Sequence, residues 1–208
     1  MKPYNYSVTV SADPAAEPLT RAQAKAHLRI DTDITDDDAL VDALIQAARE
    51  WTENYCRRSW VRRTLQLRMD CFPEVIRLPR GPVSAITSVK YTAQDGTLTT
   101  LDASNYQTDL YGIPPRIALV HGATWPIPQY GAINAVLVTY TAGYAPDEAS
   151  PTDHAANVPA AVKAAMKLLI GHWYENRELA AERQLYEAPF AVKALLAPFE
   201  IRDFTLES

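Results

Sequence analysis

Proline and glycine are unevenly distributed along this chain of 208 residues. Nine of the fifteen prolines lie between Pro73 and Pro151, and six of the seven glycines lie between Gly81 and Gly143. Because both residue types interrupt helices, the flanking stretches can hold continuous helices and the middle cannot. The sequence therefore predicts an α+β fold with a mainly helical core, built from helices at both ends of the chain, and a central antiparallel β-rich insertion.

The N-terminal flank has two helix signals. Thr20 and Gln23 have the spacing of a capping box, so a helix is expected over 20–30. Apolar residues then recur with a helical period over 35–57, which predicts a second, longer helix. Thr35 is expected to cap the start of this helix with its hydroxyl group.

The C-terminal flank predicts two further helices. One begins at Pro159, because proline suits the first helical position, where its missing N–H is not needed. Leu168 and Ile170 lie outside the main apolar face of this helix, so it is expected to be either central or shared with a neighbour. A short helix is expected over 189–196.

The middle of the chain has the two-residue period of β-strands. Asp95-Gly96 predicts a tight hairpin turn in which both central residues take positive φ. The stretch 112–130, rich in proline and aromatic residues, is expected to be an ordered loop. Strands are expected over 65–70, 86–91, 106–109, 116–120 and 136–141.

These signals divide the chain into five parts. The two helical stretches build one core, and the β-rich stretch is inserted between them. The parts are an N-terminal arm (1–18), a helical part of the core (19–60), the β-rich insertion (61–150), the C-terminal helices that complete the core (151–198) and a C-terminal tail (199–208).

Composition and charge argue against several classes of protein. No apolar run approaches the roughly 20 residues of a membrane span, and residues 1–16 are too polar for a signal peptide. Cys56 and Cys71 have neither paired spacing nor companion histidines, so reduced thiols are expected instead of a disulfide or zinc site. The net charge of −5 argues against tight nucleic-acid binding, which usually relies on a surplus of basic residues.

No group of residues has the pattern of a catalytic or cofactor site. Asp36, Asp37 and Asp38 are consecutive, and neighbouring helical residues point in different directions, so they suit a helix start better than a metal site. The four histidines are widely separated, and no nucleophile, phosphate-loop or dinucleotide motif occurs. We therefore expect no enzyme activity, no metal and no cofactor.

Segment 57–63 places four arginines around Trp60. They could follow a phosphate backbone, form a helix end and a solvated strand edge, or pair with acids of a neighbouring subunit; the acidic total favours the second reading over the first. The aromatic residues of segment 172–177 are predicted to be core or subunit contacts. The candidate subunit-interface residues are Arg57, Arg58, Arg62, Arg63, Leu168, Ile170, Trp173 and Tyr174.

The order of these segments resembles that of a known family. The series consists of LTRAQAKAHLRI at 19–30, DALVDALI at 38–45, AAREW at 47–51, the strand with Leu65 and Leu67, IRLP at 76–79, residues 83–91, TYTAGY at 139–144, and the stretch from Val158-Pro159 to HWYENR at 172–177. It resembles the head-tail connector (adaptor) proteins of long-tailed bacteriophages, prophages and gene transfer agents. The resemblance covers about residues 18–199.

The resemblance implies a structural role in a virion, with no catalytic residues. A ring of about twelve copies would dock under the portal protein, receive stopper or tail proteins, and line a channel through which DNA passes without sequence-specific binding. Such a protein is made in the cytoplasm of the host bacterium and acts at the head-tail junction, without a membrane. Family members engage the portal through C-terminal segments, which suggests strand addition. The candidate portal contacts here are Phe199, Ile201, Phe204 and Leu206.

Two other functions stay open at this stage. The chain could be another virion module, such as a tail-completion or tail-terminator protein. It could also be a hydrolase acting on carbohydrate through dispersed acidic residues. The second alternative requires a pocket with two carboxylates about 5–10 Å apart.

Overall fold

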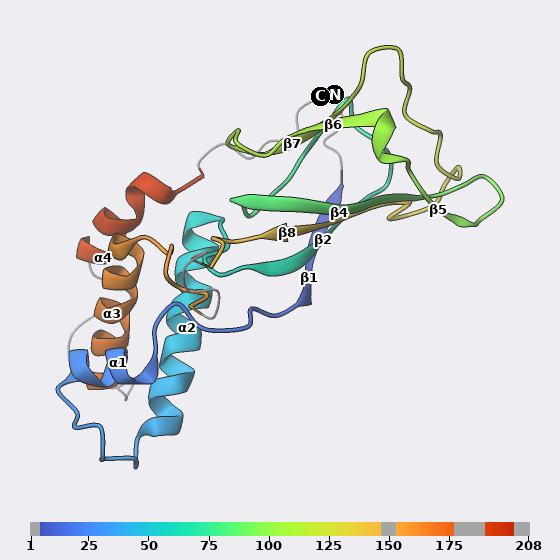
Figure 1. Cartoon of the computed structure of the whole chain (residues 1–208). Coiled ribbons are helices and arrows are strands. Elements are labelled where there is room, and N and C mark those ends of the chain that lie inside the picture. Colours follow the sequence, from blue (N-terminus) through green and yellow to red (C-terminus); the bar gives the residue numbers. More distant parts are fainter. Residues whose placement is uncertain (1–4, 147–152, 177–189, 202–208) are drawn as a thin grey trace. The chain divides into compact units, whose positions relative to one another are not determined.

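The computed structural model describes residues 5–146, 153–176 and 190–201. Contacts divide the chain into two compact units. The β unit comprises residues 1–15, 62–144 and 201–208, and the helical unit comprises residues 16–61 and 145–200. The chain thus enters the helical unit twice, before and after the long middle segment of the β unit (Figure 1).

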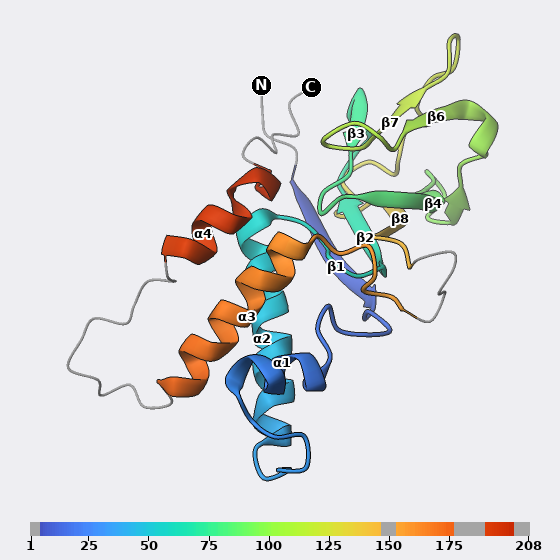
Figure 2. The same ribbon diagram turned by 60° about the vertical axis from the view of Figure 1, so that its left-hand side comes forward.

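Four helices and a 3-10 turn build the described part of the helical unit. They are α1 (Arg21–Leu28), α2 (Asp38–Cys56), α3 (Ala160–Glu175), α4 (Phe190–Leu196) and η2 (Ala197–Phe199). Helices α2 and α3 lie side by side although they are far apart in the sequence (Figures 1 and 2). Apolar residues at helical spacing on both helices form their common core. Its buried members include Val41, Ile45, Ala48, Val162, Ala165, Met166 and Leu169.

The predicted start of α1 is confirmed, and that of α2 is corrected. Thr20 is the N-cap of α1, and Thr20 and Gln23 form both hydrogen bonds of the capping box. The N-cap of α2 is Asp37, which makes no side-chain cap hydrogen bond. The expected hydroxyl cap from Thr35 is wrong, because Thr35 contributes its backbone carbonyl, which accepts the Asp38 N–H at 3.1 Å.

The β unit contains two antiparallel sheets. The five-stranded sheet has the order β1-β2-β8-β4-β5, and the three-stranded sheet has the order β3-β7-β6. The strands are β1 (Tyr6–Ala12), β2 (Arg63–Met69), β3 (Val75–Arg77), β4 (Val83–Thr92), β5 (Leu98–Thr100), β6 (Tyr106–Asp109), β7 (Arg116–Leu119) and β8 (Val136–Ala142), with a short 3-10 turn η1 (Ala103–Asn105) before β6.

The alternating pattern of β2 explains the core of the β unit. Leu65, Leu67 and Met69 are fully buried, whereas the residues between them are partly exposed. The neighbouring strand β8 has the same alternation, which puts Tyr140 in this core, where its hydroxyl donates to the Pro79 carbonyl at 2.9 Å. The remaining buried members of this core are Ile76, Leu78, Val83, Val89, Ile117, Val136, Val138 and Ala142.

The hairpin predicted at Asp95-Gly96 is present, but its turn differs from the expected one. Only Gly96 has positive φ, at +85°, whereas Asp95 does not. The Gly96 N–H donates to the Ala93 carbonyl at 2.9 Å, and the Asp95 carboxylate accepts the Thr97 N–H at 2.9 Å. The loop is one residue longer than a two-residue turn, so a single left-handed residue is enough to reverse the chain.

The loop after β7 is held by specific contacts. Trp125 stacks on Phe72 with ring centroids 4.7 Å apart. The Gln94 amide donates to the carbonyls of Ile127 and Pro128 at 3.2 and 2.7 Å. Much of the predicted ordered loop is therefore an anchored segment without regular structure, although β7 lies within the stretch 112–130.

The predicted fold class is confirmed as α+β with antiparallel sheets. The finer expectation of a mainly helical chain with helices at both ends is not confirmed, because helices account for 31% of the described residues and strands for 28%. In the described part, strand β1 precedes the first helix, within the stretch that the sequence left as an arm. None of the described helices is both long and apolar enough to cross a membrane.

The two free cysteines are expected to react very differently with alkylating reagents. Cys56 is buried in the helical unit, where burial raises the pKa of its thiol to about 12, whereas Cys71 is exposed. Only the thiolate is nucleophilic, so iodoacetamide at pH 8 should modify Cys71 in the folded protein and both cysteines in urea. Peptide mass mapping measures this, and modification of Cys56 in the folded state would contradict the burial.

Candidate functional site

Two of the four predicted interface arginines, Arg57 and Arg58, lie at the C-terminal end of α2. Arg57 is the C-cap of α2 in the left-handed conformation, with φ of +56°, and its side chain is exposed. Arg58 is half-buried, and its Nε donates to the Phe199 carbonyl at 2.6 Å. The hydrogen bond of Arg58 therefore links η2 to the end of α2. Of the two arginines, Arg57 is the exposed one.

The other two predicted arginines belong to the β unit. Arg62 is exposed, whereas Arg63 is 7% exposed at the start of β2, opposite Ala142 of β8. The segment 57–63 therefore does not present four exposed arginines. This arrangement removes the main support for a continuous phosphate-binding row, which requires accessible charges.

The start of the predicted portal-contact tail packs inside the chain. The ring of Phe199 meets that of Trp60 edge-on, with centroids 6.1 Å apart, and Trp60 is fully buried. Ile201 is 6% exposed. Phe204 and Leu206 lie outside the described residues. Phe199 and Ile201 thus have structural contacts within their own chain.

The predicted interface residues on α3 differ in how far they are buried. Ile170 is fully buried within its own chain. Leu168 is 36% exposed, and Trp173 is half-buried. Tyr174 is half-buried as well, and its hydroxyl donates to the Asp37 carboxylate.

A buried ionic network on α2 was not predicted from the sequence. Arg49 donates to Glu17 at 2.7 Å and to Glu53 at 3.2 Å, and both Arg49 and Glu53 are almost completely buried. Glu53 also accepts the backbone N–H of Trp60 at 2.8 Å. The spacing of Arg49 and Glu53 by four residues was the available signal, but such pairs usually lie on the solvent face of a helix.

A second ionic cluster joins α1 to the start of α2. Lys25 is 3% exposed, and its ammonium group lies 2.6 Å from Asp38 and donates to the carbonyls of Thr32 and Ile34. Arg21 pairs with Asp38 at 2.8 Å and also with Asp42. The acidic residues at this helix start therefore act as ion-pair partners. Across the described residues, no group of three or more His, Cys, Asp or Glu side chains is placed to hold a metal.

This cluster is expected to make the protein less stable in acid. The hydrogen bond from Lys25 lowers the pKa of Asp38, and that from Arg21 lowers the pKa of Asp42. A carboxylate with a depressed pKa stabilises the folded state above its unfolded pKa, near 4, and this contribution is lost as the pH falls through the folded value. Urea unfolding between pH 6 and pH 2 should show a smaller loss of stability below pH 4 for Asp38→Asn/Asp42→Asn than for the unmodified protein. Equal losses would contradict the assignment.

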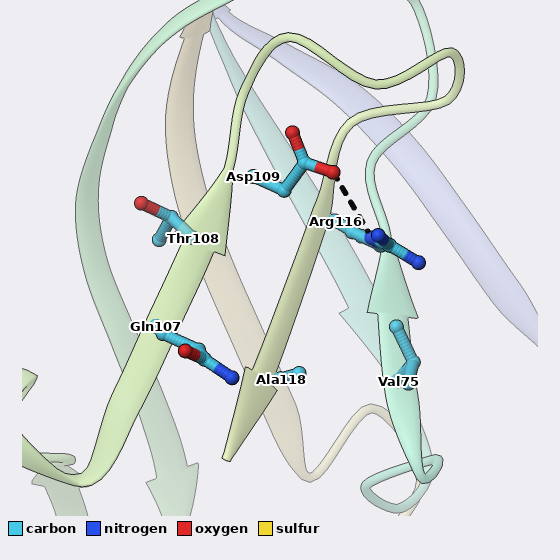
Figure 3. A pocket seen from close by; sticks show the side chains of 6 residues that line it. All are labelled: Val75, Gln107, Thr108, Asp109, Arg116 and Ala118. Carbon is cyan, nitrogen blue, oxygen red and sulfur yellow. Dashed lines mark hydrogen bonds and ion pairs between the residues drawn. The ribbon is translucent and has the colours of Figure 1, made fainter. Parts of the chain in front are cut away.

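The β unit has a surface pocket of about 400 Å³ on its three-stranded sheet (Figure 3). Its lining residues are Val75, Gln107, Thr108, Asp109, Arg116 and Ala118. The Asp109 carboxylate accepts the backbone N–H groups of Tyr111 and Gly112, and it pairs with Arg116 at 3.1 Å. These contacts, led by the Gly112 N–H, lower the pKa of Asp109. Asp109 is the one acidic residue of the lining, so the pocket lacks the two carboxylates that the hydrolase alternative requires.

Comparisons with known proteins relate the chain to a family and to solved structures. Residues 20–110 match the model of the family described as Phage gp6-like head-tail connector protein. No curated protein matches the chain. In fold, the chain is similar to a chain of "Neck of empty GTA particle computed with C6 symmetry", with a TM-score of 0.73 and 23% identity over 97% of this chain and 98% of that chain. It is also similar to a chain of "Virion of native gene transfer agent (GTA) particle", with a TM-score of 0.71 and 22% identity over 96% of this chain and 98% of that chain. A chain of "Neck of native GTA particle computed with C12 symmetry" matches with a TM-score of 0.61 and 23% identity over 94% of this chain and 98% of that chain.

At these identities the structural similarity establishes the fold, and it does so over nearly the whole length of both chains. The fold is therefore of the class seen in the necks of virus-like particles. The matching segment shows, more particularly, a resemblance to gp6-like head-tail connector proteins. The resemblance stated from the order of sequence segments is confirmed.

Proposed function

We propose that the protein is a structural subunit of the neck of a tailed phage or of a gene transfer agent particle. About twelve copies form a ring that joins the portal to the stopper or tail proteins and surrounds the DNA channel. The observation that carries this proposal is the likeness of the whole chain, at a TM-score of 0.73, to a chain from a particle neck, together with the match of residues 20–110 to a head-tail connector model.

The same observations support a non-enzymatic role. The matched family is described as one of phage head-tail connector proteins. Charged residues of the helical unit are used in ion pairs: Arg21 and Lys25 of α1 pair with Asp38 of α2, and Arg49 pairs with Glu53 within α2. The function therefore lies in the surfaces that the protein offers to other chains.

The exposed members of the predicted interface set are the proposed contacts between subunits. Arg57 and Arg62 have accessible guanidinium groups, which suit carboxylates of a neighbouring copy. Leu168 and Trp173 offer partly exposed apolar surface on α3. In the tail, the proposed contact with the portal begins after Ile201 and rests on the sequence of residues 202–208 alone.

Assembly of the purified protein tests the proposal. Native mass spectrometry and negative-stain microscopy are applied to the protein alone and after mixing with the portal protein encoded next to it. A ring of about twelve copies, alone or on the portal, is the expected result. A protein that stays monomeric and also fails to bind the portal would overturn the proposal.

Removal of the protein from a producing strain separates the connector role from that of another virion module. Loss of a connector should leave heads that have no tails attached and that leak their DNA. Loss of a tail-terminator protein should instead leave filled, intact heads beside tails of abnormal length. Electron microscopy of the lysate distinguishes the two outcomes.

A further inference from the structure

The five-stranded sheet of the β unit ends in a long open edge at β1. This strand pairs with β2 on one side, and among the described residues no strand pairs with its other side. Six of its seven residues are exposed, and it contains no charged residue and no proline. A row of backbone N–H and C=O groups is therefore available to another strand.

The opposite edge of the same sheet, β5, is also uncharged. Residues 97–101 read Thr-Leu-Thr-Thr-Leu, and the side chain of Leu98 is 59% exposed. Strand β5 pairs with β4, and no described strand lies on its outer side. In the part of the chain that the structure describes, both edges of the large sheet are thus open, and both edge strands are uncharged.

The three-stranded sheet provides an internal comparison. Its edge strands, β3 and β6, are three and four residues long, and each contains a charged residue, Arg77 and Asp109 respectively. Soluble proteins commonly protect open edges with charges, proline or very short strands. Both edge strands of the small sheet contain a charged residue and neither edge strand of the large sheet does, although β5 is as short as β3. The absence of charge is expected if another chain covers the edges of the large sheet.

The apolar face of the large sheet also continues to its open edge. The strand registers align Tyr6, Met69, Val136, Tyr91 and Thr99 in one row across the five strands. On β1, Tyr6 and Val10 lie on this face beside the buried core but remain 43% and 46% exposed. A further strand beside β1 would cover this apolar surface as well as pair with the backbone.

We propose that β1 of one copy pairs with β5 of the next copy, so that the large sheets join from subunit to subunit. Pairing of β1 with β1 is symmetric and stops at a dimer. Pairing of β1 with β5 leaves one unpaired β1 and one unpaired β5 at the two ends of each growing chain of subunits, so further copies can add until the ring closes. Two necks that contain a chain of similar fold were computed with the cyclic symmetries C6 and C12, in which neighbouring copies that touch do so head to tail. The inference rests on the proposed ring and specifies its interface.

Two edge-blocked variants test the pairing. Thr9→Lys/Val10→Lys places charges on β1, and Leu98→Lys/Thr100→Lys places them on β5; Val10 and Leu98 are exposed, so the fold should persist, which circular dichroism checks. Gln107→Lys/Thr108→Lys on the edge strand β6 is the matched control. Under conditions in which the unmodified protein forms rings, each edge-blocked variant should lose at least about tenfold in ring yield, and the control should keep it.

An equimolar mixture of the two edge-blocked variants makes the test specific. The intact β5 of the first variant can still pair with the intact β1 of the second, so native mass spectrometry should detect a heterodimer and nothing larger. Hydrogen exchange should also slow together at residues 6–12 and 97–101 when the unmodified protein forms its ring. Rings of either folded edge-blocked variant, or a mixture that stays monomeric, overturn the pairing. Failure of the unmodified protein to form a ring, alone or on the portal, instead overturns the proposed function and the pairing with it.

Discussion

Replacing Arg49 by methionine is expected to lower the free energy of unfolding by about 3–5 kcal/mol, because the substitution removes the guanidinium group that faces the buried charge of Glu53. Glu53 is 2% exposed and cannot recover its hydration by moving outward. Arg49 also holds Glu17, so the start of the helical unit loses a contact as well. Urea unfolding followed by circular dichroism measures the loss.

The double variant Arg49→Met/Glu53→Gln is the control for this prediction. Glutamine keeps an oxygen that can accept the Trp60 N–H but carries no charge. The double variant should therefore be more stable than Arg49→Met alone, because the penalty arises from burying the Glu53 charge without the Arg49 guanidinium beside it. A double variant as unstable as the single one would show that packing of the Arg49 side chain, and not its charge, is responsible.

Replacing Trp60 by alanine is expected to cost about 3–5 kcal/mol, as is typical for the removal of a large buried aromatic side chain. Trp60 is fully buried, and its ring contacts that of Phe199. The substitution should also loosen η2, which would raise the rate of hydrogen exchange at residues 197–200. Unfolding experiments and exchange measurements on the same variant test both effects.

Trp60→Phe is the matched control for the second prediction. Phenylalanine keeps an aromatic ring against Phe199 and loses the hydrogen bond from the indole Nε1–H to the Thr52 hydroxyl. That hydroxyl still donates to backbone carbonyls of α2, so the loss should be about 1 kcal/mol. Wild-type stability of the alanine variant would be incompatible with the burial of this side chain.

Local signals in the sequence predicted most elements of the fold. The capping box at Thr20 depends on two residues three positions apart, and the apolar pattern of α2 depends on spacing along one helix, so neither requires a distant partner. The same holds for the alternation in β2 and β8. The order of these elements was enough to identify the resemblance to head-tail connectors.

Strand β1 shows why other elements were missed. Its partner β2 begins more than fifty residues later, at Arg63, and its own residues include two serines and one threonine, which also occur in loops. Pairing with a distant strand decides its conformation. The candidate interface residues had the same limitation, since Arg63 and Ile170 look available in the sequence and are buried in the structure.

The sequence by itself determined the fold class, most of the helices and strands, and the connector resemblance, because these depend on periodicity, capping and segment order. Only the tertiary structure decided which charged residues form the buried network of Arg49 and Glu53, which arginines remain exposed, and which strand edges stay open. The physical reason is that burial and strand pairing depend on contacts between residues far apart in the chain, and no local pattern specifies those contacts.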